Sequence, residues 1–91
     1  MEFLVEEGRI YQKDEQQNLL AEVTYSPVRA GVVDVDHTYV DPSLRGQGIA
    51  GQMMEALAEE LRSRGLKAVA SCSYADIWLE RNRGKYADII A

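Results

Sequence analysis

The most regular hydrophobic pattern in the chain is helical and covers residues 47–64. Its apolar side chains recur every four residues, at Ile49, Met53, Leu57 and Leu61. The opposite positions carry acids and arginines, as the solvent face of an amphipathic helix does. Gly65 follows, and because glycine commonly ends helices, the helix is predicted to stop at Arg64.

Patterns with a period of two precede this helix and predict strands at residues 19–26 and 31–40. Pro27 cannot donate a hydrogen bond to a neighbouring strand, so the first strand is expected to end or bulge there. The alternation in the second strand places on one face Val33, Val35, His37 and Tyr39. It places on the other face Asp34, Asp36 and Thr38.

Shorter elements are predicted towards both ends of the chain. Residues 3–13 fit two strands around a turn at Glu7-Gly8, and the polar residues 14–18 fit a second turn. After the long helix, the pattern predicts a strand at 66–73, a helix at 74–82, a break at 83–85 and a packed segment at 86–90. Only residues 31–73 contain the strand–helix–strand crossover that parallel strands need. We therefore predict an α+β fold, with a mostly antiparallel sheet, one parallel strand pair and helices packed on the sheet.

The length of 91 residues predicts a single domain that spans residues 1–91. The formal net charge of −5 argues against nucleic acid as a partner. The charge is uneven, because residues 1–44 carry nine acids and three bases, whereas residues 45–91 carry six acids and seven bases. An anionic ligand is therefore expected to meet the second half of the chain.

Cysteine and histidine are each present once, as Cys72 and His37, so neither an internal disulfide nor a metal site is expected. The first residues lack the basic start and apolar run of a signal peptide, and no apolar stretch approaches 18 residues. These features predict a soluble, cytoplasmic protein.

The residues between the second strand pattern and the long helix carry the chemistry. Gly46 and Gly48 lack side chains where the chain turns, so another group can approach the backbone, and Arg45 adds a positive charge. Unpaired N–H groups at a helix start bind phosphates in many proteins. The local pattern alone leaves two alternatives open, an anion-binding loop and a tight turn that glycines merely shape.

The sequence Arg45-Gly46-Gln47-Gly48-Ile49-Ala50 resembles the Q/R-x-x-G-x-G/A pyrophosphate loop of the GNAT superfamily, the acyl-CoA-dependent N-acyltransferases. The neighbouring runs His37-Thr38 and Cys72-Ser73-Tyr74 resemble small single-domain members of the YjdJ type. The resemblance covers about residues 19–90.

This resemblance implies a fold in which two parallel strands, here 31–40 and 66–73, splay apart around acetyl-CoA or coenzyme A. Backbone groups near Tyr39 and Val40 would pair with the pantetheine arm. The pyrophosphate would lie on the loop residues Arg45, Gly46, Gln47, Gly48, Ile49 and Ala50.

His37 and Cys72 are the candidate catalytic residues, and each has a plainer interpretation. A lone histidine on an apolar strand face is usually a hydrogen-bonded, partly buried side chain, but in this family it would point toward the acyl-transfer site and take a proton from the amine. A lone cysteine is usually a small buried side chain, but here it would line the thioester pocket or accept the acyl group transiently.

The sequence departs from the family pattern at two places. Tyr39 stands where sequences of the YjdJ type usually carry a glutamate, a candidate base. The tyrosine that many GNAT enzymes use to protonate the leaving thiolate has no clear match, with Trp78 near its place and Tyr74 or Tyr86 as substitutes.

The resemblance implies transfer of an acetyl group from acetyl-CoA to a small-molecule or protein amine, by direct attack on the thioester. The alternative is a non-catalytic module that binds acyl-CoA or another protein. The chain is too short for the helices that often enclose the acceptor in larger relatives, so the acceptor site is expected to be open or completed by a second subunit of a homo-oligomer.

Overall fold

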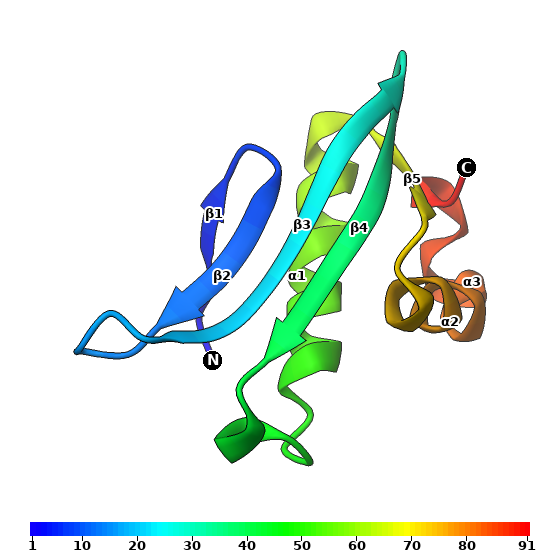
Figure 1. Cartoon of the computed structure of the whole chain (residues 1–91). Helices are drawn as coiled ribbons and strands as arrows, with labels where there is room; N and C mark the ends of the chain where they lie inside the picture. The colour runs from blue at the N-terminus through cyan, green and yellow to red at the C-terminus, as the bar shows by residue number, and fades with distance from the viewer.

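The computed structural model describes residues 1–91 as one five-stranded sheet with helices packed against it (Figure 1). The strands stand in chain order: β1 Leu4–Glu6, β2 Arg9–Lys13, β3 Leu19–Arg29, β4 Val32–Val40 and β5 Lys67–Ala70. Neighbouring strands are antiparallel except β4 and β5, which are parallel. The predicted α+β class and its single parallel pair are confirmed.

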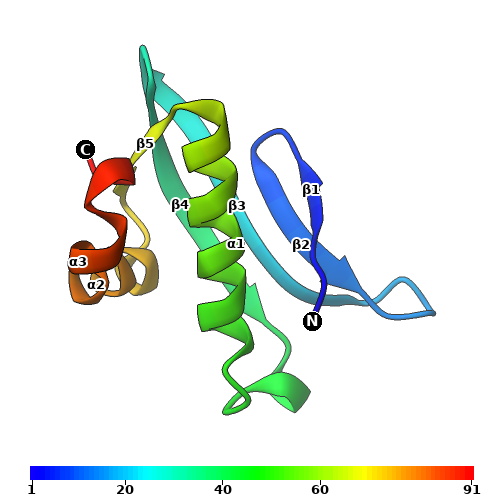
Figure 2. The same ribbon diagram turned by 180° about the vertical axis from the view of Figure 1, so that it is seen from behind.

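Helix α1, Ile49–Arg64, connects β4 to β5 and lies across one face of the sheet (Figures 1 and 2). Its apolar side packs on the sheet, and the fully buried residues include Met53, Leu57, Leu61, Val23 and Val35. The residues at the predicted four-residue spacing therefore form the side of α1 that faces the core. The helix begins two residues later than predicted, because Gly48 adopts a left-handed conformation with φ 75°.

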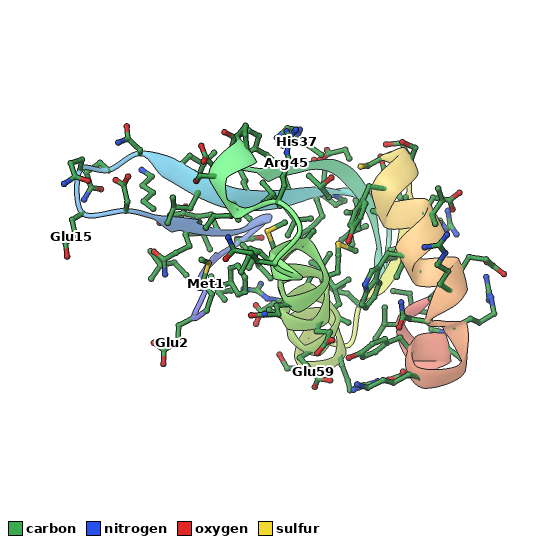
Figure 3. The ribbon with its side chains drawn as sticks, turned by 90° about the horizontal axis from the view of Figure 1, so that it is seen from below. Met1, Glu2, Glu15, His37, Arg45 and Glu59 are labelled. Carbon is green, nitrogen blue, oxygen red and sulfur yellow. The ribbon has the colours of Figure 1, made fainter.

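The opposite face of the sheet carries no helix. Seen along the sheet in Figure 3, α1 lies on one side and the side chain of His37 projects from the other. We call this uncovered surface the open face.

Strand β4 contains a β-bulge at Asp36. Thr24 of β3 pairs with His37, but the next residue, Tyr25, pairs with Val35, so Asp36 has no partner across the strands. Its carboxylate instead accepts a hydrogen bond from the Thr24 hydroxyl at 2.6 Å.

This bulge reverses the predicted faces of the residues that follow it. Cross-strand partners share a face of a sheet, and Thr38 pairs with the buried Val23. Thr38 therefore lies on the helix side, whereas His37 and Tyr39 lie on the open face. The prediction that these two residues share the face of Val35 is wrong, because the strict alternation on which it rested is broken by one extra residue.

Strand β3 runs through Pro27 rather than stopping there. Pro27 pairs with Val33, and the register shifts immediately afterwards, between Pro27 and Arg29. Of the two predicted outcomes at the proline, the irregular register is the one that occurs.

The parallel strands separate after a short stretch. Pairing of β4 with β5 covers only Val32–Val35, and β5 ends at Ala70, three residues before the predicted end. The chain then enters α2, Ser73–Arg81, which lies beside β4 and β5. Beyond Val35, the edge of β4 that faces away from β3 has no strand partner.

The predicted break at 83–85 is wrong: these residues begin a short helix, α3, Arg83–Tyr86, and α2 ends before it, at Arg81. The predicted packed segment at 86–90 forms a 3-10 helix, Ala87–Ile89. Ile90 makes an isolated bridge to Ala68, which returns the chain to the sheet. None of the helices is both long enough and apolar enough to cross a membrane.

Candidate functional site

The loop before α1 presents open backbone at the helix start. Asp41 caps a short 3-10 helix, Pro42–Leu44, by accepting a hydrogen bond from the Ser43 N–H at 3.0 Å. Gly46 and Gly48 then take left-handed conformations with φ 84° and 75°, and nothing lies within 4 Å of the place where a Cβ would stand on either. No side chain caps the N-terminus of α1, and its first turn contains no acid. Backbone N–H groups and the positive end of the helix dipole are therefore available to an anion.

A cavity of about 180 Å³ lies at this loop. Its lining residues are Val40, Leu44, Arg45, Gly46, Gly48, Ile49, Ala50, Gly51 and Tyr74. Six of the eight predicted cofactor residues line it; Gln47 and Tyr39 do not. The Gln47 side chain donates to the Ser43 carbonyl at 3.2 Å, and the Arg45 Nε donates to the Val40 carbonyl at 3.3 Å, so both contacts hold the loop against the strand end.

Beyond Val35, β4 has separated from β5 and its free edge faces the start of α2; we call the space between them the gap. The backbone of β4 directs hydrogen-bonding groups toward this gap at alternate residues. The Asp41 N–H bonds to Leu20 of β3, so Tyr39, two residues earlier, also directs its backbone toward β3. Thr38 and Val40 direct theirs toward the gap. The backbone groups of Thr38, rather than those of Tyr39, are therefore free to pair with an extended ligand. The sequence does not identify Thr38, because the bulge leaves no trace in the hydropathy pattern.

Cys72 lies where α2 begins, across the gap from β4. Its N–H bonds to the Val35 carbonyl at 3.1 Å, and its Sγ lies 3.4 Å from the Thr38 hydroxyl. Burial alone would raise the pKa of the thiol, but hydrogen bonds from Thr38 and from the backbone at the start of α2 outweigh it and lower the pKa. The thiol therefore ionises more readily than that of an ordinary cysteine, and it stands beside the gap.

His37 is on the open face, on the side of β4 away from the core. Its side chain is 53% exposed, and its Nε2 lies 3.6 Å from a carboxylate oxygen of Glu22. Glu22 is held in turn by the Arg9 Nε at 2.5 Å. The structure therefore does not bring His37 and Cys72 to the same side of β4, and His37 is neither buried nor apolar in its surroundings.

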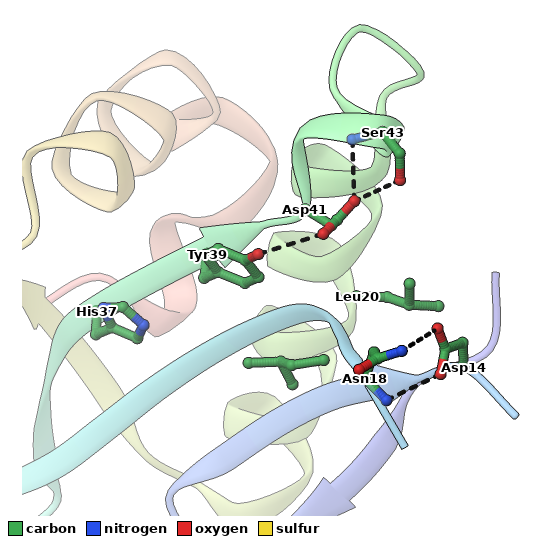
Figure 4. A pocket seen from close by; sticks show the side chains of 8 residues that line it. Asp14, Asn18, Leu20, His37, Tyr39, Asp41 and Ser43 are labelled. Carbon is green, nitrogen blue, oxygen red and sulfur yellow. Dashed lines mark hydrogen bonds between the residues drawn. The ribbon is translucent and has the colours of Figure 1, made fainter. Parts of the chain in front are cut away.

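The open face also holds a larger pocket, of about 590 Å³, between the β2–β3 turn and the end of β4 (Figure 4). Its lining residues are Asp14, Asn18, Leu19, Leu20, His37, Tyr39, Asp41 and Ser43. The Tyr39 hydroxyl donates to Asp41 at 3.4 Å. The end of β4 thus separates this pocket from the loop cavity, with Val40 on one and Tyr39 on the other.

The two tyrosines that could replace the missing proton donor occupy different places. Tyr74 lines the loop cavity, and burial raises the pKa of its hydroxyl. Tyr86 is only 2% exposed and stacks against Trp78, with ring centroids 5.4 Å apart. Tyr86 is therefore a core residue, and Tyr74 is the tyrosine that a ligand in the loop cavity could reach.

Comparison with known proteins agrees with this geometry. The family model described as GCN5-related N-acetyl-transferase matches residues 9–89. The structure of a GCN5-like protein from Staphylococcus aureus is 37% identical, with a TM-score of 0.81, and the match covers 99% of this chain and 87% of that one.

Larger enzymes share the fold. A GNAT-family N-acetyltransferase from Escherichia coli, solved in complex with CoA, is 24% identical with a TM-score of 0.61 over 68% of this chain. The ribosomal-protein-alanine N-acetyltransferase from Brucella melitensis is 25% identical with a TM-score of 0.62 over 84% of this chain. The match covers only 38% and 51% of those two proteins.

Proposed function

The chain belongs to the GCN5-related N-acetyltransferase family, and on that basis we propose that it binds acetyl-CoA at the loop before α1 and transfers the acetyl group to an amine. The observation that carries this proposal is the loop cavity. There, two glycines with left-handed backbone face open space at an uncapped helix start, and Arg45 lines the same cavity.

The proposed binding mode uses the whole gap between β4 and α2. The amides from Gly46 to Ala50 hold the pyrophosphate, because they point outward at the positive end of α1. The pantetheine arm extends along the free edge of β4 and pairs with the backbone of Thr38 and Val40. This places the thioester near Cys72, where a backbone N–H of β4 polarises its carbonyl.

The acceptor amine approaches from the open face. The pocket there lies on the other side of the β4 end, and its carboxylates, Asp14 and Asp41, suit a molecule with a cationic end. His37 takes the proton from the attacking nitrogen, and Glu22 beside it stabilises the imidazolium that results. The amine nitrogen bonds to the carbonyl carbon, the C–S bond breaks, and Tyr74 returns a proton to the leaving thiolate.

Cys72 has two roles in this scheme that its position allows. It lines the thioester end of the gap, and its lowered pKa also permits transient acylation of the sulfur. We favour pocket lining, because direct transfer to the amine needs no intermediate on the protein.

The second candidate function is a non-catalytic acyl-CoA-binding module. The observation that favours it is the separation of His37 from Cys72 by the strand itself, together with the tyrosine at position 39. Such a module would keep the loop cavity and the gap, and would lack turnover.

Thiol release from acetyl-CoA tests the two functions against each other. Wild-type protein and His37→Ala are assayed with and without a panel of amines, and calorimetry measures CoA affinity for both. If the protein is an enzyme, thiol release should depend on the amine and fall roughly 100-fold in His37→Ala, in the usual range for loss of a general base. The CoA affinity of the variant should be unchanged. Tight CoA binding without release against any amine would support the module.

The acceptor pocket is either open or completed by a second copy of the chain, and the oligomeric state of the same samples decides between the two. Sedimentation with and without CoA reports the oligomeric state. We further propose that the protein acts in the cytoplasm on a small-molecule or protein amine, without nucleic acid.

A further inference from the structure

A third cavity, of about 200 Å³, lies at the end of the molecule opposite the loop before α1. In Figure 1 this end contains the β1–β2 turn, the tip of the β3–β4 hairpin and the end of α1. The lining residues are Glu7, Gly8, Tyr25, Pro27, Arg29, Gly31, Val32, Val33, Arg64 and Leu66. None of these residues lines either pocket described above.

Tyr25 lines this cavity and carries an unsatisfied polar group. The side chain is only 6% exposed, and its hydroxyl is buried without any hydrogen-bond partner. A buried hydroxyl without a partner is unfavourable and rare, so a partner that the protein itself does not supply would be stabilising.

Two arginines border the same cavity. Arg64 is partly neutralised, because its Nε donates to Glu60 one turn earlier on α1. Arg29 forms no ion pair or side-chain hydrogen bond. Its guanidinium therefore retains all its donors, which fit the two oxygens of a carboxylate.

The remaining wall limits the kind of anion. Glu7, the one acid in the lining, also has no ion-pair partner, so the cavity carries little net positive charge and does not suit a dianion such as phosphate. The rest is apolar, with side chains of Pro27, Val32, Val33 and Leu66. This combination fits a monoanion with a short apolar tail.

We propose that this cavity binds a small organic carboxylate, with the Tyr25 hydroxyl and the Arg29 guanidinium donating to its oxygens and the apolar wall covering its tail. The hydroxyl is shielded from solvent in the free protein, so binding requires a side chain of the cavity wall to move. The inference is independent of acetyl transfer, and it concerns a site at the far end of α1.

Butyrate and its neutral isostere butyramide are the probes. Each is titrated into the full chain, and backbone amide shifts of Gly8 and Gly31 are followed by NMR. We expect butyrate to shift both amides with saturation in the millimolar range and butyramide to shift neither. Absence of saturable shifts, or equal shifts with butyramide, would overturn the proposal.

Three variants identify the contacts. Arg29→Gln and Tyr25→Phe should each weaken butyrate about tenfold, the effect of losing one hydrogen bond to a charged group. Glu7→Gln should strengthen it about threefold, because a nearby negative charge is removed. Arg81→Gln, the same charge change on α2, serves as the control and should leave affinity unchanged.

Tyr25→Phe also separates binding from folding. Because the hydroxyl has no partner in the free protein, the variant should melt at the same temperature or higher. A fall in Tm of more than about 4 °C would show that the hydroxyl is satisfied in the free protein and would remove the basis for the site.

Discussion

The hydroxyl of Thr38 and the sulfur of Cys72 lie 3.4 Å apart, across the gap where β4 and β5 have separated. Thr38 occupies this place because the bulge at Asp36 turns it toward the helix side of the sheet. One inserted residue thus decides which side chain of the His37-Thr38 pair meets the cysteine.

The thiol of Cys72 should become reactive at a lower pH than the same thiol in the unfolded chain. Hydrogen bonds in the folded protein favour the thiolate and lower the pKa. The rate of iodoacetamide alkylation against pH measures the midpoint, in buffer and in denaturant. Thr38→Val should move the folded midpoint upward, whereas Ser63→Ala, which removes a hydroxyl near the end of α1, should not. Coincident midpoints for the folded wild type and Thr38→Val would contradict this.

Gly48→Glu should eliminate measurable CoA binding, because it places bulk and negative charge where the pyrophosphate is proposed to lie. The left-handed backbone also costs about 1–2 kcal/mol of stability for any residue with a side chain. Gly65→Glu is the matched control, because Gly65 ends the same helix with φ 68° and also faces open space. Both variants should lose stability, Gly65→Glu more, because its carboxylate lies at the negative end of the helix dipole. Calorimetry should show CoA binding lost only in Gly48→Glu; retained affinity in that variant would refute the loop as the site.

Asp88 should stabilise the protein at neutral pH and cease to do so in acid. Its carboxylate accepts two hydrogen bonds from Arg62, at 2.6 and 2.8 Å, which hold its pKa below the usual range. A carboxyl with a lowered folded pKa contributes stability above its unfolded pKa, about 3.9, and loses that contribution as pH falls through the folded value.

The Tm of Asp88→Asn against wild type, measured from pH 7 to pH 2, tests this pair. The difference should be constant near neutrality, shrink below about pH 4 and vanish in stronger acid. A difference that does not change with pH would mean that the contact acts through shape rather than charge.

His37→Ala should change the free energy of unfolding by less than about 0.5 kcal/mol, because the side chain is half exposed and outside the core. Val35→Ala, two residues earlier at a fully buried position, should cost about 2 kcal/mol. Urea denaturation of both variants measures the contrast. A large loss in His37→Ala would place the histidine in the core, as strict alternation predicts.

Much of the architecture is readable in the sequence because it follows from repeating side-chain patterns. The apolar spacing of Met53, Leu57 and Leu61 predicts the face of α1, and Gly65 predicts its end. The single parallel crossover follows from the one strand–helix–strand succession in the chain. Gly46 and Gly48 identify the loop, since their backbone conformations need residues without side chains.

The faces of β4 are not readable in the same way. A bulge depends on hydrogen bonds between strands, and residues 31–40 alternate as regularly as those of an unbroken strand. The exposure of His37, the contact between Thr38 and Cys72, and the position of Tyr39 in the open-face pocket all follow from it. The choice between Tyr74 and Tyr86 likewise needed the packing of the final helices.

The early end of β5 leaves an unpaired strand edge inside the sheet rather than at its margin. Open edges generally invite pairing with strands of other chains and so promote aggregation. Here α2 follows β5 beside this edge, and the loop before α1 continues from its end. A ligand that pairs with β4 as proposed would occupy the same backbone groups that another strand would use. Ligand binding would therefore also remove β4 as a surface for self-association.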